Sequence, residues 1–230
     1  MKKVRLLLSI ALLPLLCACY RGPLVKSRFF YGMASYNISY KIEDSASFTE
    51  SYLAKQNGTR VHIFVGKGNY LEHYNNGTFN LYARRLNLCA YRGVNDDTHY
   101  AQKASTVNPR GGELKKQRKA FKEGREFRKM VWSNAQEETT YYFHHKNKFN
   151  PRSWRNVKFN QKHLLHHQLQ YLPKFIEVKE NGYTSLLTLD VCEKQGMHRV
   201  FFEEYWSIIN IYKDLFQRDN HFFRVGHLQK

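Results

Sequence analysis

Residues 69–82 read NYLEHYNNGTFNLY, which places Asn76-Gly77 between two β-prone runs. Asn-Gly adopts the positive φ angles of a type I′ turn at little steric cost, so this stretch predicts a β-hairpin. The arrangement recurs at Asn57-Gly58, between 52–54 and 59–65, and at Asn181-Gly182, between 175–178 and 185–191. Three such hairpins predict a mostly antiparallel sheet.

Apolar and polar side chains alternate along the runs beside these turns. The alternating apolar sets are Val61, Ile63 and Val65; Ile176 and Val178; and Leu187, Leu189 and Val191. A period of two predicts strands with one face on a core and the other amphipathic or wet.

Two stretches depart from this strand pattern. Residues 95–118 are polar and contain Pro109 and Gly111-Gly112, which favours a long loop or a marginal helix between two halves of the sheet. Apolar residues between Tyr205 and Phe216 recur at helical spacing, so we expect a helix near the C-terminus.

The N-terminus has the pattern of an export signal. Three basic residues among the first five precede the apolar run 6–16, which is too short to span a bilayer and is interrupted by Pro14. The run ends Leu16-Cys17-Ala18-Cys19, which resembles the bacterial lipobox. That resemblance implies cleavage after Ala18 and acylation of Cys19, which would anchor the mature chain to a membrane. An ordinary signal peptide cut at a small residue is the alternative.

Length and composition favour one folded domain. The chain has 230 residues, of which 15% are aromatic, so disorder and low-complexity classes are excluded. We therefore expect a signal peptide over 1–18, a lipidated tether over 19–32 and a single domain over 33–230. Tyr20 rather than Asp follows the lipobox Cys, and by resemblance to Gram-negative lipoproteins this indicates the outer membrane, on its periplasmic face.

The mature chain from about residue 41 to 203 is similar in pattern to the LolA/LolB-like periplasmic carriers and lipoproteins and their Bacteroidetes relatives. The segments that carry the resemblance are 121–129, the strand ending Tyr141-Tyr142-Phe143, the turn Phe149-Asn150-Pro151, and Tyr171-Leu172-Pro173 leading into 174–178. The resemblance implies an α+β fold: an incomplete antiparallel half-barrel around a few helices, with a concavity for acyl chains or another hydrophobic or amphiphilic ligand. The residues that we expect to line this concavity are Val61, Ile63, Val65, Ile176, Val178, Leu187 and Leu189.

Two cysteines remain besides Cys19 in the mature domain. Cys89 and Cys192 are candidates for a disulfide, because exported proteins enter an oxidising compartment. Two buried thiols are the alternative.

The sequence shows no catalytic or metal-binding constellation. It lacks a Gly-x-Ser-x-Gly nucleophile motif, a Walker-type phosphate loop and a Cys-x-x-Cys pair. His163 and His167 have the spacing of two ligands on one helix face, with His144 and His145 elsewhere, but a basic surface cluster explains them more simply. We therefore expect no enzyme activity, no cofactor and no metal site.

The charge is strongly and unevenly basic. The chain has 37 Lys and Arg against 19 Asp and Glu, a formal charge of +18. Eight basic residues lie in residues 115–129, interleaved with Phe121 and Phe127. In an exported protein such a face would meet anionic lipid or glycan rather than nucleic acid. It is also compatible with a structural or assembly lipoprotein docking to an envelope complex, or with a face that only keeps the protein soluble.

Overall fold

The structure is a computed structural model that describes residues 30–43, 48–66, 69–94, 99–104, 111–148, 171–194 and 223–225. These residues form twelve strands, one α-helix and one short 3-10 helix. The elements are β1 (Gly32–Ile42), α2 (Glu50–Asn57), β2 (Arg60–Val65), β3 (Asn69–Tyr74), β4 (Phe79–Ala83), η1 (Arg84–Leu86), β5 (Leu88–Arg92), β6 (His99–Lys103), β7 (Glu113–Lys122), β8 (Arg125–Ser133), β9 (Glu137–Lys148), β10 (Tyr171–Glu180), β11 (Tyr183–Lys194) and β12 (Phe223–Val225).

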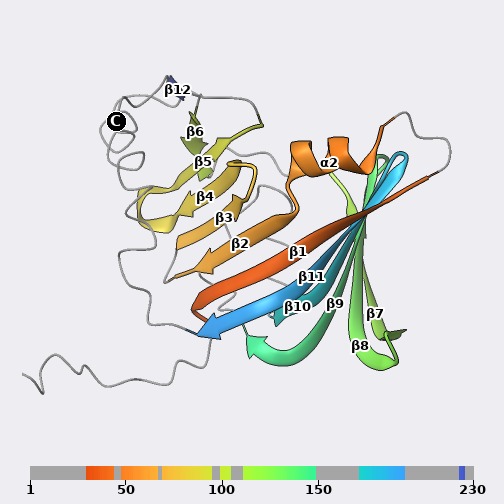
Figure 1. Ribbon diagram of the computed structural model, residues 1–230. Coiled ribbons are helices and arrows are strands. Elements are labelled where there is room, and N and C mark those ends of the chain that lie inside the picture. Colours follow the sequence, from red (N-terminus) through yellow and green to blue (C-terminus); the bar gives the residue numbers. More distant parts are fainter. Residues whose placement is uncertain are drawn as a thin grey trace, which may run out of the picture.

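All twelve strands belong to one antiparallel sheet. Their order is β12-β6-β5-β4-β3-β2-β1-β11-β10-β9-β8-β7, which ends at β12 and β7 and so is open. Two chain-consecutive meanders, β1–β6 and β7–β11, meet where β1 pairs with β11 from Gly32↔Lys194 to Ile42↔Tyr183. Figure 1 shows the sheet twisting about this junction, with β2–β5 forming one wing, β7–β9 the other, and α2 lying across one end. The predicted mostly antiparallel sheet with few helices is confirmed, and the helix predicted near the C-terminus lies outside the described residues.

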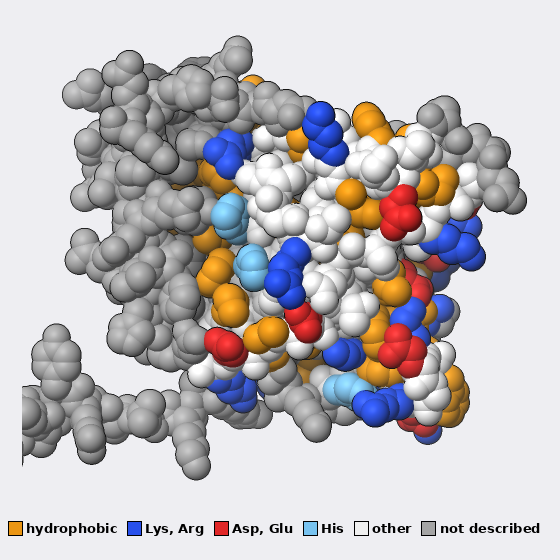
Figure 2. Space-filling model, viewed as in Figure 1, with side chains coloured by type: hydrophobic (Ala, Val, Ile, Leu, Met, Phe, Trp, Pro, Cys, Tyr) orange, Lys and Arg blue, Asp and Glu red, His pale blue; other side chains and the backbone are white. Residues whose placement is uncertain are grey.

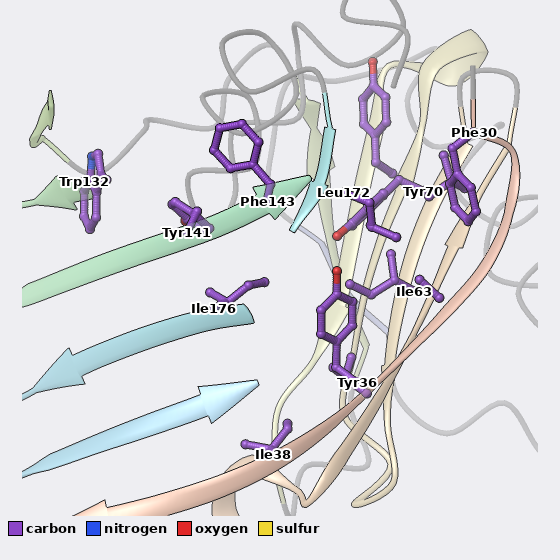
Figure 3. Packing of buried hydrophobic residues seen from close by; sticks show 14 of the residues in the cluster. Phe30, Tyr36, Ile38, Ile63, Tyr70, Trp132, Tyr141, Phe143, Leu172 and Ile176 are labelled. Carbon is purple, nitrogen blue, oxygen red and sulfur yellow. The ribbon is translucent and has the colours of Figure 1, made fainter. Parts of the chain in front are cut away.

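The concave face of the sheet, called the inner face below, carries the hydrophobic core. Figure 3 shows side chains from both wings, among them Tyr36, Ile63 and Tyr70 on one side and Trp132 and Tyr141 on the other. Tyr36 is fully buried, and its hydroxyl donates to the carbonyl of Pro173 on β10 at 2.7 Å. This hydrogen bond crosses the β1–β11 junction and ties the two meanders together.

Strands β3–β6 are apolar also on the face opposite the inner face. Leu71, Leu81, Ala90 and Ala101 are directly paired across these strands and at most 2% exposed. The expectation of one wet face therefore does not hold for this wing.

The Asn-Gly pairs occur in turns of different backbone geometry. Asn76-Gly77 forms the predicted hairpin, but through a three-residue loop in which Gly77 has φ 85° and its N–H donates to the carbonyl of Tyr74. Asn181-Gly182 joins β10 to β11 with positive φ at the glycine only. A type I′ backbone, positive at both central residues, occurs instead at Glu123-Gly124 between β7 and β8.

The hairpin predicted at Asn57-Gly58 is wrong, because the residues before it form helix α2. Thr49 caps the start of the helix by accepting a hydrogen bond from the N–H of Tyr52. Gly58 ends it with φ 78° and donates to the carbonyl of Ala54. Asn-Gly suits this position for the same reason that it suits a turn, namely its tolerance of positive φ.

The segment 95–118, expected to be a loop or marginal helix, contains β6 and the first half of β7. Glu113 and Lys115 are exposed on β7, at the edge of the sheet, where solvent accepts polar side chains. A bulge between Gln117 and Ala120 interrupts the pairing of β7 with β8.

A second bulge shifts the face that β11 presents. Tyr36 pairs with Leu189 but Ser35 pairs with Val191, so Asp190 is the extra residue. As a result Cys192, and not the predicted Val191, joins Leu187 and Leu189 against the core. The Asp190 carboxylate accepts a hydrogen bond from Arg60 on β2 at 2.6 Å, across the intervening β1.

Two glycines with positive φ differ in the space around them, so replacing each by alanine tests whether Asn75 packs against the end of α2. A Cβ on Gly58 would lie 2.8 Å from Asn75 Oδ1, whereas one on Gly124 would meet nothing within 4 Å, although both glycines have positive φ. We expect Gly124→Ala to lower the free energy of unfolding by about 1 kcal/mol and Gly58→Ala by roughly 2–3 kcal/mol, measured by urea unfolding. Equal losses would show that Asn75, which accepts from the N–H groups of Thr59 and Arg60, plays no part in this packing.

Candidate functional site

A cavity of about 400 Å³ opens on the inner face of the sheet. One wall is the surface of β1, β11, β10 and β9; the facing wall comes from the β3–β4 hairpin and from Gly93-Val94, and Gln56 and Asn57 at the end of α2 complete the rim. Its size lies within the usual range of small-molecule pockets.

Strand register arranges the main wall in three rows that run across the sheet. The apolar row consists of Ile38, Leu187, Ile176 and Tyr141, each directly paired with the next on the neighbouring strand. Two residues along the strands, the middle row consists of Tyr40, Ser185, Val178 and Thr139. Two residues further, the acidic row consists of Tyr183, Glu180 and Glu137. The cavity wall therefore changes from hydrocarbon to carboxylate over about 13 Å, given roughly 3.3 Å per residue in a strand.

The acidic row is held by local hydrogen bonds. Glu180 accepts from the hydroxyl of Tyr183, and Glu137 accepts from Thr139 Oγ1 at 2.6 Å. Burial and then the negative charge of Glu180 raise the pKa of Tyr40 to about 12, and burial and Glu180 also raise that of Tyr183. The hydroxyl of Tyr40 donates to the carbonyl of Gly58, which fixes its ring beside the helix end.

A third carboxylate lies behind the facing wall. Glu72 on β3 is 1% exposed, accepts a hydrogen bond from Tyr70 at 2.6 Å, and accepts another from the amide of Asn80, which lines the cavity, at 3.1 Å. Burial first, and then the negative charge of Glu72 among other groups, raises the pKa values of Tyr36 and Tyr74. Glu72 thus orients a cavity-lining amide from the interior of the protein.

The seven residues expected to line a concavity divide into two groups. Ile176, Val178 and Leu187 line the cavity. Val61, Ile63 and Val65 lie on the inner face within the hydrophobic core and do not line the cavity, and Leu189 packs against that core.

Sequence reasoning missed the polar part of the cavity. Tyr183 and Ser185 continue the alternation of Leu187, and Glu180 continues that of Ile176 and Val178, so the same period-two count extended to the strand ends would have placed them. Glu137 and Glu180 are far apart in sequence, and the pairing of β9 with β10 brings them side by side.

The remaining candidate residues lie elsewhere. Cys89 on β5 and Cys192 on β11 are separate thiols rather than a disulfide; four strands lie between β5 and β11 in the sheet. Cys19, His163 and His167 lie outside the described residues, and His144 is exposed on β9. Among the described residues, no three potential metal ligands cluster and no helix is long and apolar enough to cross a membrane.

The basic residues of 113–129 lie on the β7–β8 hairpin at the sheet edge. Figure 2 shows this side of the molecule, at the right, carrying basic and acidic side chains with hydrophobic ones between them. Lys115 and Lys119 face Glu113 and Glu126 at 3.3 Å and 3.2 Å, and Lys122 pairs with Glu177 and lies 4.9 Å from the centre of the Tyr142 ring. Phe121 is 77% exposed.

Comparison with solved structures gives a weak likeness. No family model matches the chain, and no curated protein matches it. A crystal structure of a domain assigned to an outer membrane lipoprotein-sorting protein from Vibrio parahaemolyticus is similar over 79% of this chain and 92% of that chain, with 7% sequence identity and a TM-score of 0.22. At that TM-score the function proposed below rests on this chain's own residues.

The buried tyrosines predict a loss of stability at alkaline pH. A phenol whose pKa is raised on folding holds its proton more tightly in the folded state, so its contribution is complete below pH 10.0, the ordinary tyrosine value, and is lost as pH rises toward about 12. We expect the free energy of unfolding to fall over this window, measured by urea unfolding at each pH. Tyr40→Phe should make the free energy of unfolding fall less steeply with pH. An unchanged slope would show that Tyr40 does not contribute to this pH dependence.

Proposed function

We propose that the protein is an envelope lipoprotein that binds a hydrophobic or amphiphilic molecule in the inner-face cavity. The observation that carries the proposal is the cavity itself: about 400 Å³ beside a continuous apolar row on a sheet that remains open. A concave site of this size, bordered by Ile38, Ile176 and Leu187 and by a few polar groups, is the kind of site in which proteins bind small apolar or amphiphilic molecules.

A tryptophan placed in the cavity tests this function. Leu187 lines the cavity, while its neighbour Leu186 points to the other face of β11, and both are half-buried. We expect Leu187→Trp to weaken binding of the neutral fluorescent probe N-phenyl-1-naphthylamine at least tenfold, about 1.4 kcal/mol, because the indole fills the apolar row. Leu186→Trp should bind the probe as the parent protein does.

Circular dichroism of both variants verifies that they are folded. Parent-like probe binding by a folded Leu187→Trp protein would refute the cavity as the site. A protein that binds no probe and is isolated lipid-free within a stable complex would favour the second candidate, a structural or assembly role. The observation for that role is the exposed Phe121 among basic side chains of the β7–β8 hairpin, a combination suited to anionic lipid or glycan surfaces.

Membrane attachment is the second part of the proposal and rests on the lipobox-like sequence around Cys19. Several acyl chains on one residue anchor a protein durably, whereas one chain binds reversibly. We expect the full chain expressed in a Gram-negative host to fractionate with membranes and Cys19→Ser to be released into the soluble fraction. Cys17→Ser, two residues away, is the matched control and should remain with the membrane; membrane retention of Cys19→Ser would refute the anchor.

A further inference from the structure

The charge of the cavity is opposite to that of the protein. The chain carries a formal charge of +18, yet the cavity lining contributed by the described part of the chain includes Glu137 and Glu180 and no lysine or arginine. An anionic headgroup would be attracted to the protein as a whole and repelled by this wall. The polarity of the cavity thus selects among the amphiphiles that the proposed function allows.

The two cavity carboxylates are placed directly opposite each other. Glu180 on β10 pairs in register with Glu137 on β9, an arrangement in which neighbouring Cβ atoms are about 4.5–5.5 Å apart and like charges destabilise the sheet. Thr139 and Tyr183 hold the two side chains by hydrogen bonds on the cavity wall. A cation bound in front of them would relieve their mutual repulsion.

Aromatic rings surround the same end of the cavity. Tyr183 belongs to the acidic row, Tyr40 to the middle row, and Tyr74 lines the cavity from the facing wall. The rings of Tyr40 and Tyr183 are 6.4 Å apart and tilted at 56°, and Phe48 packs edge-on against Tyr183 at 5.4 Å. Ring faces attract ammonium groups, and aromatic enclosures with nearby carboxylates are a recurrent means of binding them.

The apolar row provides the second half of the recognition. Ile38, Leu187 and Ile176 lie side by side on β1, β11 and β10, about 13 Å along the strands from the acidic row. A chain molecule lying along the strands would place its hydrocarbon on the apolar row and its head between Tyr183, Glu180 and Glu137. A molecule that binds favourably to both the apolar row and the acidic row must be apolar at one end and cationic at the other.

We propose that the cavity binds amphiphiles whose headgroup carries an ammonium group, in preference to anionic or uncharged amphiphiles of the same chain length. This inference rests on the proposed function, because it names the ligand class of the same cavity. Glu137 and Glu180 provide the charge complement, and the tyrosine rings provide the enclosing surface.

Matched single-chain amphiphiles test the preference. Decyltrimethylammonium, decyl sulfate and decyl maltoside would each be titrated, below the concentration at which they form micelles, against N-phenyl-1-naphthylamine bound to the full chain. We expect decyltrimethylammonium to displace the probe at a concentration about tenfold lower than decyl sulfate does. The net charge of the protein favours the opposite order, so non-specific attraction cannot produce this result.

Variants assign the preference to the acidic row. Glu137→Gln with Glu180→Gln is expected to raise the displacing concentration of decyltrimethylammonium about tenfold and to leave that of decyl maltoside unchanged. The replacement removes two opposed like charges, so the fold should be retained, and Glu180→Gln alone should give a smaller shift in the same direction. Glu126→Gln, at an exposed carboxylate of β8 outside the cavity, is the matched control and should change neither value.

The outcomes separate this inference from the function on which it rests. If decyl sulfate displaces the probe as well as or better than decyltrimethylammonium, or if the double variant keeps the preference, the ammonium inference is overturned while the apolar cavity stands. If neither the probe nor decyl maltoside binds, the proposed function fails first.

Discussion

The ladder between β1 and β11 is the constraint on which the rest of the molecule depends. It joins strands near the two ends of the described chain, from Gly32↔Lys194 to Ile42↔Tyr183, and without it the two meanders would be separate sheets with no common core. Its closure is expensive in chain entropy, because about 150 residues separate the paired strands. Burial of Tyr36 and its hydrogen bond to Pro173 offset part of that cost at the centre of the ladder. The register of this ladder also aligns the cavity rows, since Ile38 meets Leu187 and Tyr40 meets Ser185 only in this pairing.

Local sequence signals predicted the strands well where a strand pairs with its neighbour in the sequence. The β3–β4 and β10–β11 hairpins follow from Asn-Gly and flanking alternation. Asn57-Gly58 carries the same signal but ends a helix, since Thr49 caps Glu50–Asn57 and positive φ serves both structures. Edge strand β7 was missed because its residues pair on one side only and tolerate a loop-like composition. The bulge at Asp190 has no sequence signature, so alternation assigned Val191 to the face that Cys192 occupies.

The cavity was predictable only in part, for a physical reason. Alternation identifies which side chains share a face, and so it found Ile176, Val178 and Leu187. It does not tell whether a face is packed or hollow, and Val61, Ile63 and Val65 have the same pattern in a filled region. The neighbours Glu137 and Glu180 are 43 positions apart in sequence (180 − 137) and meet only through β9–β10 pairing. The spacing of residues in a motif cannot identify residues that come together only through the pairing of strands distant in sequence.

An open sheet of this length has to avoid polymerising through its terminal strands. β7, the last strand in the order, carries lysines at 115, 119 and 122 and a bulge between Gln117 and Ala120. Charged side chains and a break in the regular backbone both oppose the docking of a second strand. The same strand that leaves the sheet unclosed therefore also opposes the fibrous self-association of neighbouring copies.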